Sequence, residues 1–124
     1  MDTDITYIKS FHISYNPAIA TSLSGMGGYY VRRYGKICIL NSSIRVKAAF
    51  DVVNNYIYEL PDDCLPNWNV SEMTFAFNDT NKTVKYQNVV LQDGKLWLSQ
   101  PVATNDVIEI NVTYIAANIA WTYY

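Results

Sequence analysis

The stretch that decides the fold is Val89-Val90-Leu91-Gln92-Asp93-Gly94-Lys95-Leu96-Trp97-Leu98. It consists of two apolar runs separated by the dipeptide Asp93-Gly94. An Asp-Gly pair between such runs is the strongest local indication of a β-hairpin, because both residues accept the positive φ angles of a tight turn. The sequence therefore predicts two antiparallel strands joined at this point.

Strand patterns separated by turn signals continue on both sides of this hairpin, and helical periodicity is absent. Three segments alternate between apolar and polar residues, which predicts one buried and one solvated face. The residues expected inside are Ile108, Ile110, Val112 and Tyr114 of the last strand, Ile44, Val46, Ala48 and Phe50 of a middle strand, and Met73, Phe75 and Phe77 of a third. About eight short strands at regular spacing favour an all-β, antiparallel β-sandwich or jelly-roll-like domain.

The chain divides into two parts by composition. Small residues from Ser22 to Gly28 are typical of a flexible linker. We therefore expect an N-terminal strand or arm with its linker over residues 1–27 and a β-sandwich head domain over residues 28–124. Trp97 alternates with core residues, so on a lone domain it would be exposed. An exposed aromatic residue on a regular sheet suggests a protein partner, and the simplest partner is another copy of the chain.

Composition excludes several classes of function. The formal net charge is −2, with no basic stripe or charge run, so neither nucleic acid nor a charged membrane surface is an expected partner. No apolar run approaches transmembrane length, so we expect no membrane insertion. The N-terminus lacks the features of a signal peptide. Eleven tyrosines and twelve asparagines suit either a binding surface or an ordinary β-rich protein.

Residues with catalytic or metal-binding potential are sparse. The single histidine, His12, lies in a strand without a nucleophile motif, so we interpret it as structural. Cys38 and Cys64 are expected to be buried thiols, and their spacing does not suit a metal. Four carboxylates that could form a hydrolase pair, Glu59, Asp62, Asp63 and Glu72, lie around a turn. We therefore expect no enzyme activity, no cofactor and no metal.

A succession of motifs resembles a known family. Residues Gly28 to Leu40 run through two tyrosines, two arginines and a Gly35-Lys36 turn into a β-branched strand. Further pieces follow in order: Leu60-Pro61, Pro66, Asp93-Gly94-Lys95-Leu96 and Thr113-Tyr114-Ile115. This set resembles the C-terminal domains of tail proteins from phages and prophages of Gram-positive bacteria. The family usually has a glycine between the two prolines, whereas this chain has Asp62-Asp63-Cys64-Leu65.

The resemblance implies a receptor-binding head of a phage tail fibre or baseplate. Such a head is a homotrimeric β-sandwich that recognises host cell-wall saccharide, contacts other tail or baseplate proteins, and is carried in the virion after synthesis in the bacterial cytoplasm. Three alternatives stay open: a structural or trimerisation domain without a ligand, a polysaccharide-degrading tail enzyme, and a host-derived trimeric β domain.

One loop offers a candidate ligand site. Trp and Tyr faces flanked by Asn and Asp suit sugars, and loops on a rigid sandwich can present them. The loop carries Trp68 together with Asp62, Asp63, Asn67 and Asn69. Trp68 could instead plug the end of the sandwich. Tyr56 and Tyr58 are further candidates.

Overall fold

The computed structural model describes residues 8–25 and 30–117, and over these residues the chain is all β. This confirms the all-β, antiparallel fold that the sequence predicts. The helical segments of the described part are two single-turn 3₁₀ helices, η1 (Ala20–Ser22) and η2 (Asp62–Cys64). The strands are β1 (Ile8–His12), β2 (Ser14–Tyr15), β3 (Leu23–Gly25), β4 (Tyr30–Tyr34), β5 (Ile37–Val46), β6 (Tyr58–Glu59), β7 (Val70–Asn78), β8 (Val84–Gln92), β9 (Lys95–Leu98) and β10 (Asp106–Ile115).

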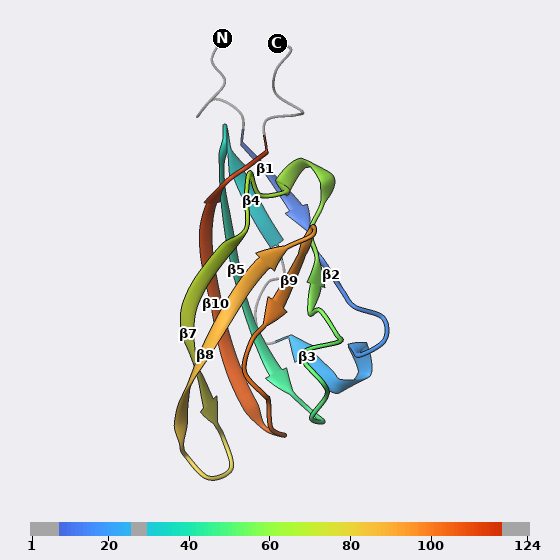
Figure 1. Ribbon diagram of the computed structural model, residues 1–124, viewed down its shortest axis with the longest axis vertical. Helices are drawn as coiled ribbons and strands as arrows, with labels where there is room; N and C mark the ends of the chain where they lie inside the picture. Colours follow the sequence, from blue (N-terminus) through green and yellow to red (C-terminus); the bar gives the residue numbers. More distant parts are fainter. Residues whose placement is uncertain (1–7, 26–29, 118–124) are drawn as a thin grey trace.

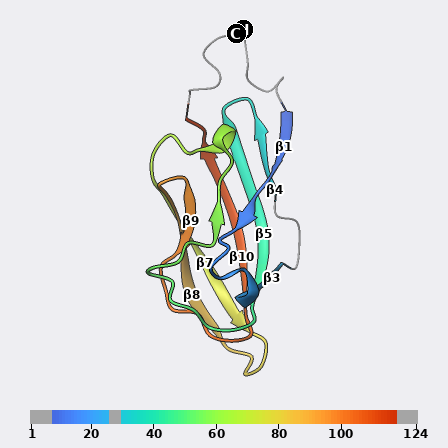
Figure 2. The same ribbon diagram turned by 90° about the vertical axis from the view of Figure 1, so that its right-hand side faces the viewer.

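All strands belong to one sheet with the order β1-β4-β5-β10-β7-β8-β9-β6-β2, and β3 pairs with β5. β1 and β2 occupy opposite ends of this order, although only Ile13 separates them in the sequence. A single residue spans about 3.5 Å, so the two ends of the sheet must come close together. The sheet is therefore curled into an elongated, nearly closed barrel (Figures 1 and 2).

The two strongest sequence signals are confirmed. Asp93 and Gly94 have φ angles of 56° and 75° and form the turn of the β8–β9 hairpin. In β10, Ile108, Ile110, Val112 and Tyr114 point into the core, and the residues between them face solvent.

The middle strand ends earlier than predicted. β5 contributes Ile44 and Val46 to the core, but the strand ends at Val46. The prediction that the inward alternation continues to Ala48 is therefore wrong, and Ala48 is exposed. The backbone N–H groups of Lys47 and Ala48 bond to the carbonyl of Ser22 instead of a sheet neighbour. Phe50 is half-buried against the core from a loop.

The inward face of β7 is the reverse of the predicted one. Met73, Phe75 and Phe77 are exposed, whereas Ala76 and Asn78 are buried. Pairing with β10 sets the register, because Ala76 lies opposite the core residue Ile108. Residues paired across a sheet share a face, so the aromatic residues of β7 must point outward.

The N-terminal segment belongs to the same sheet as the rest of the chain. β1 pairs with β4, β2 with β6, and β3 with β5. The predicted linker 22–28 thus contains a paired strand at Leu23–Gly25, while residues 26–28 lie outside the described part. The start of β1 and the end of β10 lie at one end of the barrel, and the β7–β8 hairpin extends from the other end (Figure 1).

Three further side chains bear on the predictions. Trp97 is on the outer face, but the expectation that it is exposed on a lone domain is wrong. Its side chain is half-buried: Nε1 donates to the Gln92 carbonyl at 3.2 Å, and the ring packs against Tyr56 in a T-shaped arrangement. Cys38 and Cys64 are buried free thiols, as expected. A hydrogen bond with Cys38, together with burial, raises the pKa of Cys64.

Candidate functional site

The predicted ligand loop is a continuous surface feature between β6 and β7. Trp68 is 70% exposed, so the alternative that it plugs the end of the barrel is wrong. Asp62, Asn67 and Asn69 are also exposed, while Asp63 is half-buried. The loop therefore presents an aromatic face together with carboxylate and amide groups to solvent.

The backbone of this loop is held firmly from behind. Arg33 of β4 is 1% exposed, and its guanidinium donates to the carbonyls of Gly35 and Asp63. The Tyr114 hydroxyl donates to the Cys64 carbonyl at 2.7 Å.

The end of β10 holds the same loop further along. Asn67 N–H donates to the Ile115 carbonyl at 2.8 Å, and Ala117 N–H donates to the Leu65 carbonyl at 2.7 Å. These hydrogen bonds order the loop before a ligand arrives. The loop backbone therefore loses little conformational entropy when a ligand binds.

The two weaker aromatic candidates do not join this site as free faces. Tyr58 is fully buried, stacks on Tyr15 with ring centroids 5.1 Å apart, and shares a hydrogen bond with Ser42. Tyr58 is a core residue and is not available to a ligand. Tyr56 is half-buried against Trp97.

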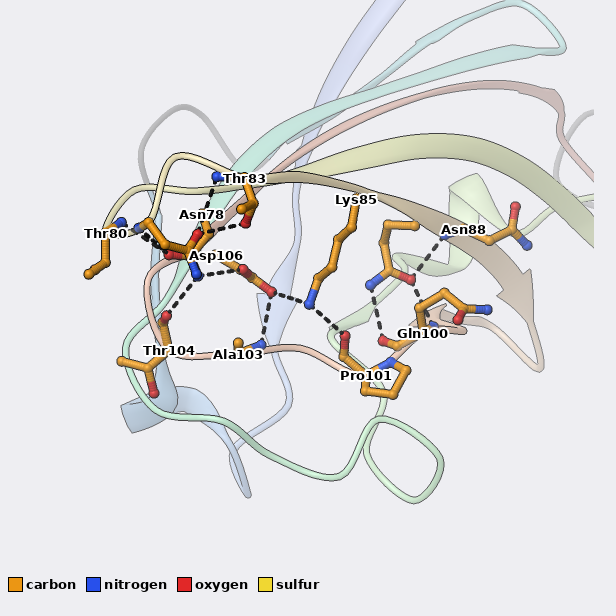
Figure 3. Close-up of polar contacts among 12 residues, drawn as sticks. Asn78, Thr80, Thr83, Lys85, Asn88, Gln100, Pro101, Ala103, Thr104 and Asp106 are labelled. Carbon is orange, nitrogen blue, oxygen red and sulfur yellow. Dashed lines mark hydrogen bonds and ion pairs between the residues drawn. The ribbon is translucent and has the colours of Figure 1, made fainter.

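Asp106 is the buried carboxylate among the described residues, and protein groups satisfy its charge and its hydrogen bonds. Its oxygens accept from Asn78 Nδ2 at 2.9 Å and from the Ala103 N–H at 2.8 Å, and Lys85 Nζ lies 3.0 Å away (Figure 3). Burial alone would raise the pKa of Asp106, but these hydrogen bonds and the Lys85 charge outweigh it and hold the pKa below its ordinary value of 3.8. The group ties the β7–β8 hairpin to the loop before β10.

Residues 8–25 and 30–117 contain no cluster of three His, Cys, Asp or Glu side chains that could hold a metal ion. No helix among these residues is long and apolar enough to cross a membrane.

A second surface feature, which the sequence did not indicate, is a shallow hollow of about 250 Å³ on the outer face of β4 and β5. Tyr30, Arg32, Ile39 and Asn41 line it. They are two neighbouring cross-strand pairs, since Tyr30 lies opposite Asn41 and Arg32 lies opposite Ile39. The one sequence feature that bears on this hollow is the alternation of inward and outward residues along β4. This alternation does not specify which strand pairs with β4.

The outer face of the β7–β8 hairpin forms an exposed apolar surface. Phe75 lies opposite Tyr86 and Phe77 lies opposite Val84, and Met73 extends the row. All five side chains are exposed, including Met73 at 67% and Phe75 at 57%. We call these residues the β7–β8 apolar face. Exposed apolar residues that adjoin one another in this way mark interaction surfaces.

Comparison with protein-family models, with curated proteins and with solved structures finds no match to this chain. The resemblance to phage tail domains therefore stays a prediction, and the function has to be argued from the surface itself.

Proposed function

We propose that this chain is a non-catalytic receptor-binding domain of a phage tail, which recognises host cell-surface saccharide and acts as a homotrimer. The observation that carries the proposal is the exposed ring of Trp68 on a loop whose backbone is fixed by Arg33 and by the end of β10. A flat apolar ring next to hydrogen-bonding groups is the arrangement that suits a sugar, which has apolar C–H faces and a rim of hydroxyls.

In this proposal Trp68 stacks on one sugar ring. Asp62, Asp63, Asn67 and Asn69 bond the hydroxyls. Such a site is shallow and weak, because it contacts one or two sugar rings only. Three copies in a trimer compensate by avidity, since linked sites bind a repetitive polymer together without any new contact.

A glycan array and adsorption to host cells test the site. Loss of a stacking aromatic residue typically costs about 2 kcal/mol, or about 30-fold in affinity. Trp68→Ala should therefore lose detectable attachment, while Trp68→Phe, which keeps a ring, should retain part of it. Val53→Ala, which shortens another exposed apolar residue, is the control and should bind as the parent does. Attachment of Trp68→Ala at the parental level would refute this site.

The glycan array and a product analysis on cell-wall polymer separate the alternatives. A parent protein that binds no glycan on the array is a structural domain, and release of sugar products from cell-wall polymer would identify a hydrolase.

The trimer in this proposal is formed through the β7–β8 apolar face. Phe75 is central to that face and opposes Tyr86. Placing a charge in an apolar interface is costly because the charge loses its water. Phe75→Lys should therefore convert the trimer to a monomer in sedimentation experiments, while its circular dichroism stays that of a β protein. A parent chain that sediments as a monomer at micromolar concentration would refute the trimer.

A further inference from the structure

The hollow on β4 and β5 is lined by Arg32, whose charged group has no ion-pair partner among the described residues. Of the three arginines in the chain, Arg33 bonds backbone carbonyls and Arg45 pairs with Asp79. Arg32 has no carboxylate or carbonyl partner within the described residues, and it is exposed on the outer face. Of the four described residues that line the hollow, Arg32 is the charged one. Among residues 8–25 and 30–117, therefore, no side chain supplies a counter-charge to the positive group of the hollow.

The other three lining residues provide complementary chemistry. Tyr30 is 49% exposed, and its ring and that of His12 pack in a T-shaped arrangement with centroids 5.4 Å apart. Ile39 gives an apolar floor. Asn41 donates its amide N–H to Asn111 Oδ1 at 2.6 Å, which fixes its orientation and leaves its own carbonyl oxygen as an acceptor.

These groups define a ligand class. The tyrosine ring and Ile39 suit the apolar face of a sugar, and Asn41 accepts from a hydroxyl. A guanidinium binds carboxylate or phosphate oxygens through two parallel hydrogen bonds. A hollow of about 250 Å³ is smaller than most ligand pockets, so it suits a single ring.

We infer that this hollow is a second saccharide subsite, which takes one sugar ring bearing a phosphate or carboxylate group. The inference rests on the proposed saccharide recognition and adds to it the selection of acidic polymers. Because Arg32 is exposed, the attraction is screened by salt, and binding at this subsite weakens as ionic strength rises.

Titrations of the full chain by isothermal calorimetry and NMR test the subsite with four probes: glucose, glucose 6-phosphate, glucuronic acid and inorganic phosphate. The parent protein should bind the two acidic sugars at least tenfold more tightly than glucose, and more tightly than inorganic phosphate. The two acidic sugars also distinguish a phosphate-bearing from a uronic-acid polymer as the natural source.

Variants assign the effect to named side chains. Arg32→Gln should reduce the binding of acidic sugars at least tenfold and leave glucose unchanged, while Tyr30→Ala should weaken all three sugars. Lys47→Gln removes an exposed positive charge outside the hollow and is the matched control, so it should change nothing beyond twofold. Equal effects of Arg32→Gln and Lys47→Gln would show a general charge effect and overturn the inference. Inorganic phosphate bound as tightly as glucose 6-phosphate would also overturn it, since the hollow would then hold an anion and not a sugar.

Failure of the inference and failure of the proposed function are distinguishable. If the glycan array shows binding that depends on Trp68 but no acidic sugar binds at the hollow, the inference alone is wrong. If the parent protein binds neither neutral nor acidic saccharide, the proposed function fails and the inference fails with it. If Trp68→Ala loses attachment to cells but keeps glucose 6-phosphate binding that depends on Arg32, both hold.

Discussion

The carboxylate of Asp106 should contribute a measurable part of the stability of the barrel. Its side chain is 1% exposed and holds the Ala103 N–H, the Asn78 amide and the Lys85 ammonium. Asp106→Asn keeps the shape but removes the charge and turns one acceptor into a donor. Hydrogen bonds to charged groups contribute about 1.5–3 kcal/mol each, and the exposed Lys85 can return to water, so the net cost should be about 2–3 kcal/mol.

This cost translates into a clear shift in thermal unfolding. An unfolding entropy of about 2.1 cal/mol/K per residue over 124 residues gives a decrease in Tm of about 10 °C. Circular dichroism at one fixed protein concentration is the appropriate assay, because association would make Tm depend on concentration. The matched control is Asp79→Asn, which removes an ion pair with Arg45 from a partly exposed carboxylate. An exposed pair contributes about 1 kcal/mol or less, so the control should shift Tm by a few degrees at most.

The pH dependence gives an independent test. The native pKa of Asp106 lies below its ordinary value of 3.8, so its stabilisation is complete above about pH 5 and is lost as the pH falls through the carboxyl range. Asp106→Asn should therefore lose less stability than the parent between pH 5 and pH 2. If Asp106→Asn costs no more than Asp79→Asn at pH 7, or if its acid-side slope equals that of the parent, the network does not have the role argued for it.

Three further predictions concern the core and one turn. Ala76→Leu should destabilise the protein by about 1–3 kcal/mol in urea unfolding, because Ala76 is 1% exposed and extra methylene groups generally overpack a close-packed core. A neutral result would contradict the inward orientation of Ala76. Cys38 and Cys64 are both fully buried, so iodoacetamide should label neither in the native protein and both after denaturation, as mass spectrometry can show; rapid native labelling would refute their burial. Gly94→Ala should cost about 1 kcal/mol, because the φ angle of 75° strains a residue with a Cβ, and an unchanged unfolding midpoint would refute this.

Local signals account for the features that the sequence predicted well. The Asp93-Gly94 turn needs only two residues that accept positive φ, and both are adjacent in the chain. β10 alternates between apolar and polar residues from Ile108 to Tyr114, so the buried face of this stretch follows from its own composition. These two elements required no knowledge of their partners.

β7 shows why the same reasoning failed elsewhere. Its three largest apolar residues, Met73, Phe75 and Phe77, alternate as a core face would, yet they point outward. The inward positions are held by Ala76, which lies opposite Ile108, and by Asn78, whose amide bonds to Asp106 and to the Thr104 carbonyl. A buried asparagine is stable only with such partners. They lie 26 and 28 residues away, so the strand's own composition cannot reveal them.

The two candidate sites depend on the same kind of long-range information. Arg32 and Arg33 are adjacent and chemically identical, and the sequence gives no reason to treat them differently. In β4 they point to opposite faces, so Arg33 is buried and fixes the loop of Trp68, while Arg32 faces solvent beside Tyr30. A shift of β4 by one residue would exchange these roles, because the side-chain period of a strand is two. The pairing of β4 with β5 therefore sets both the support of the predicted sugar loop and the charge of the second subsite.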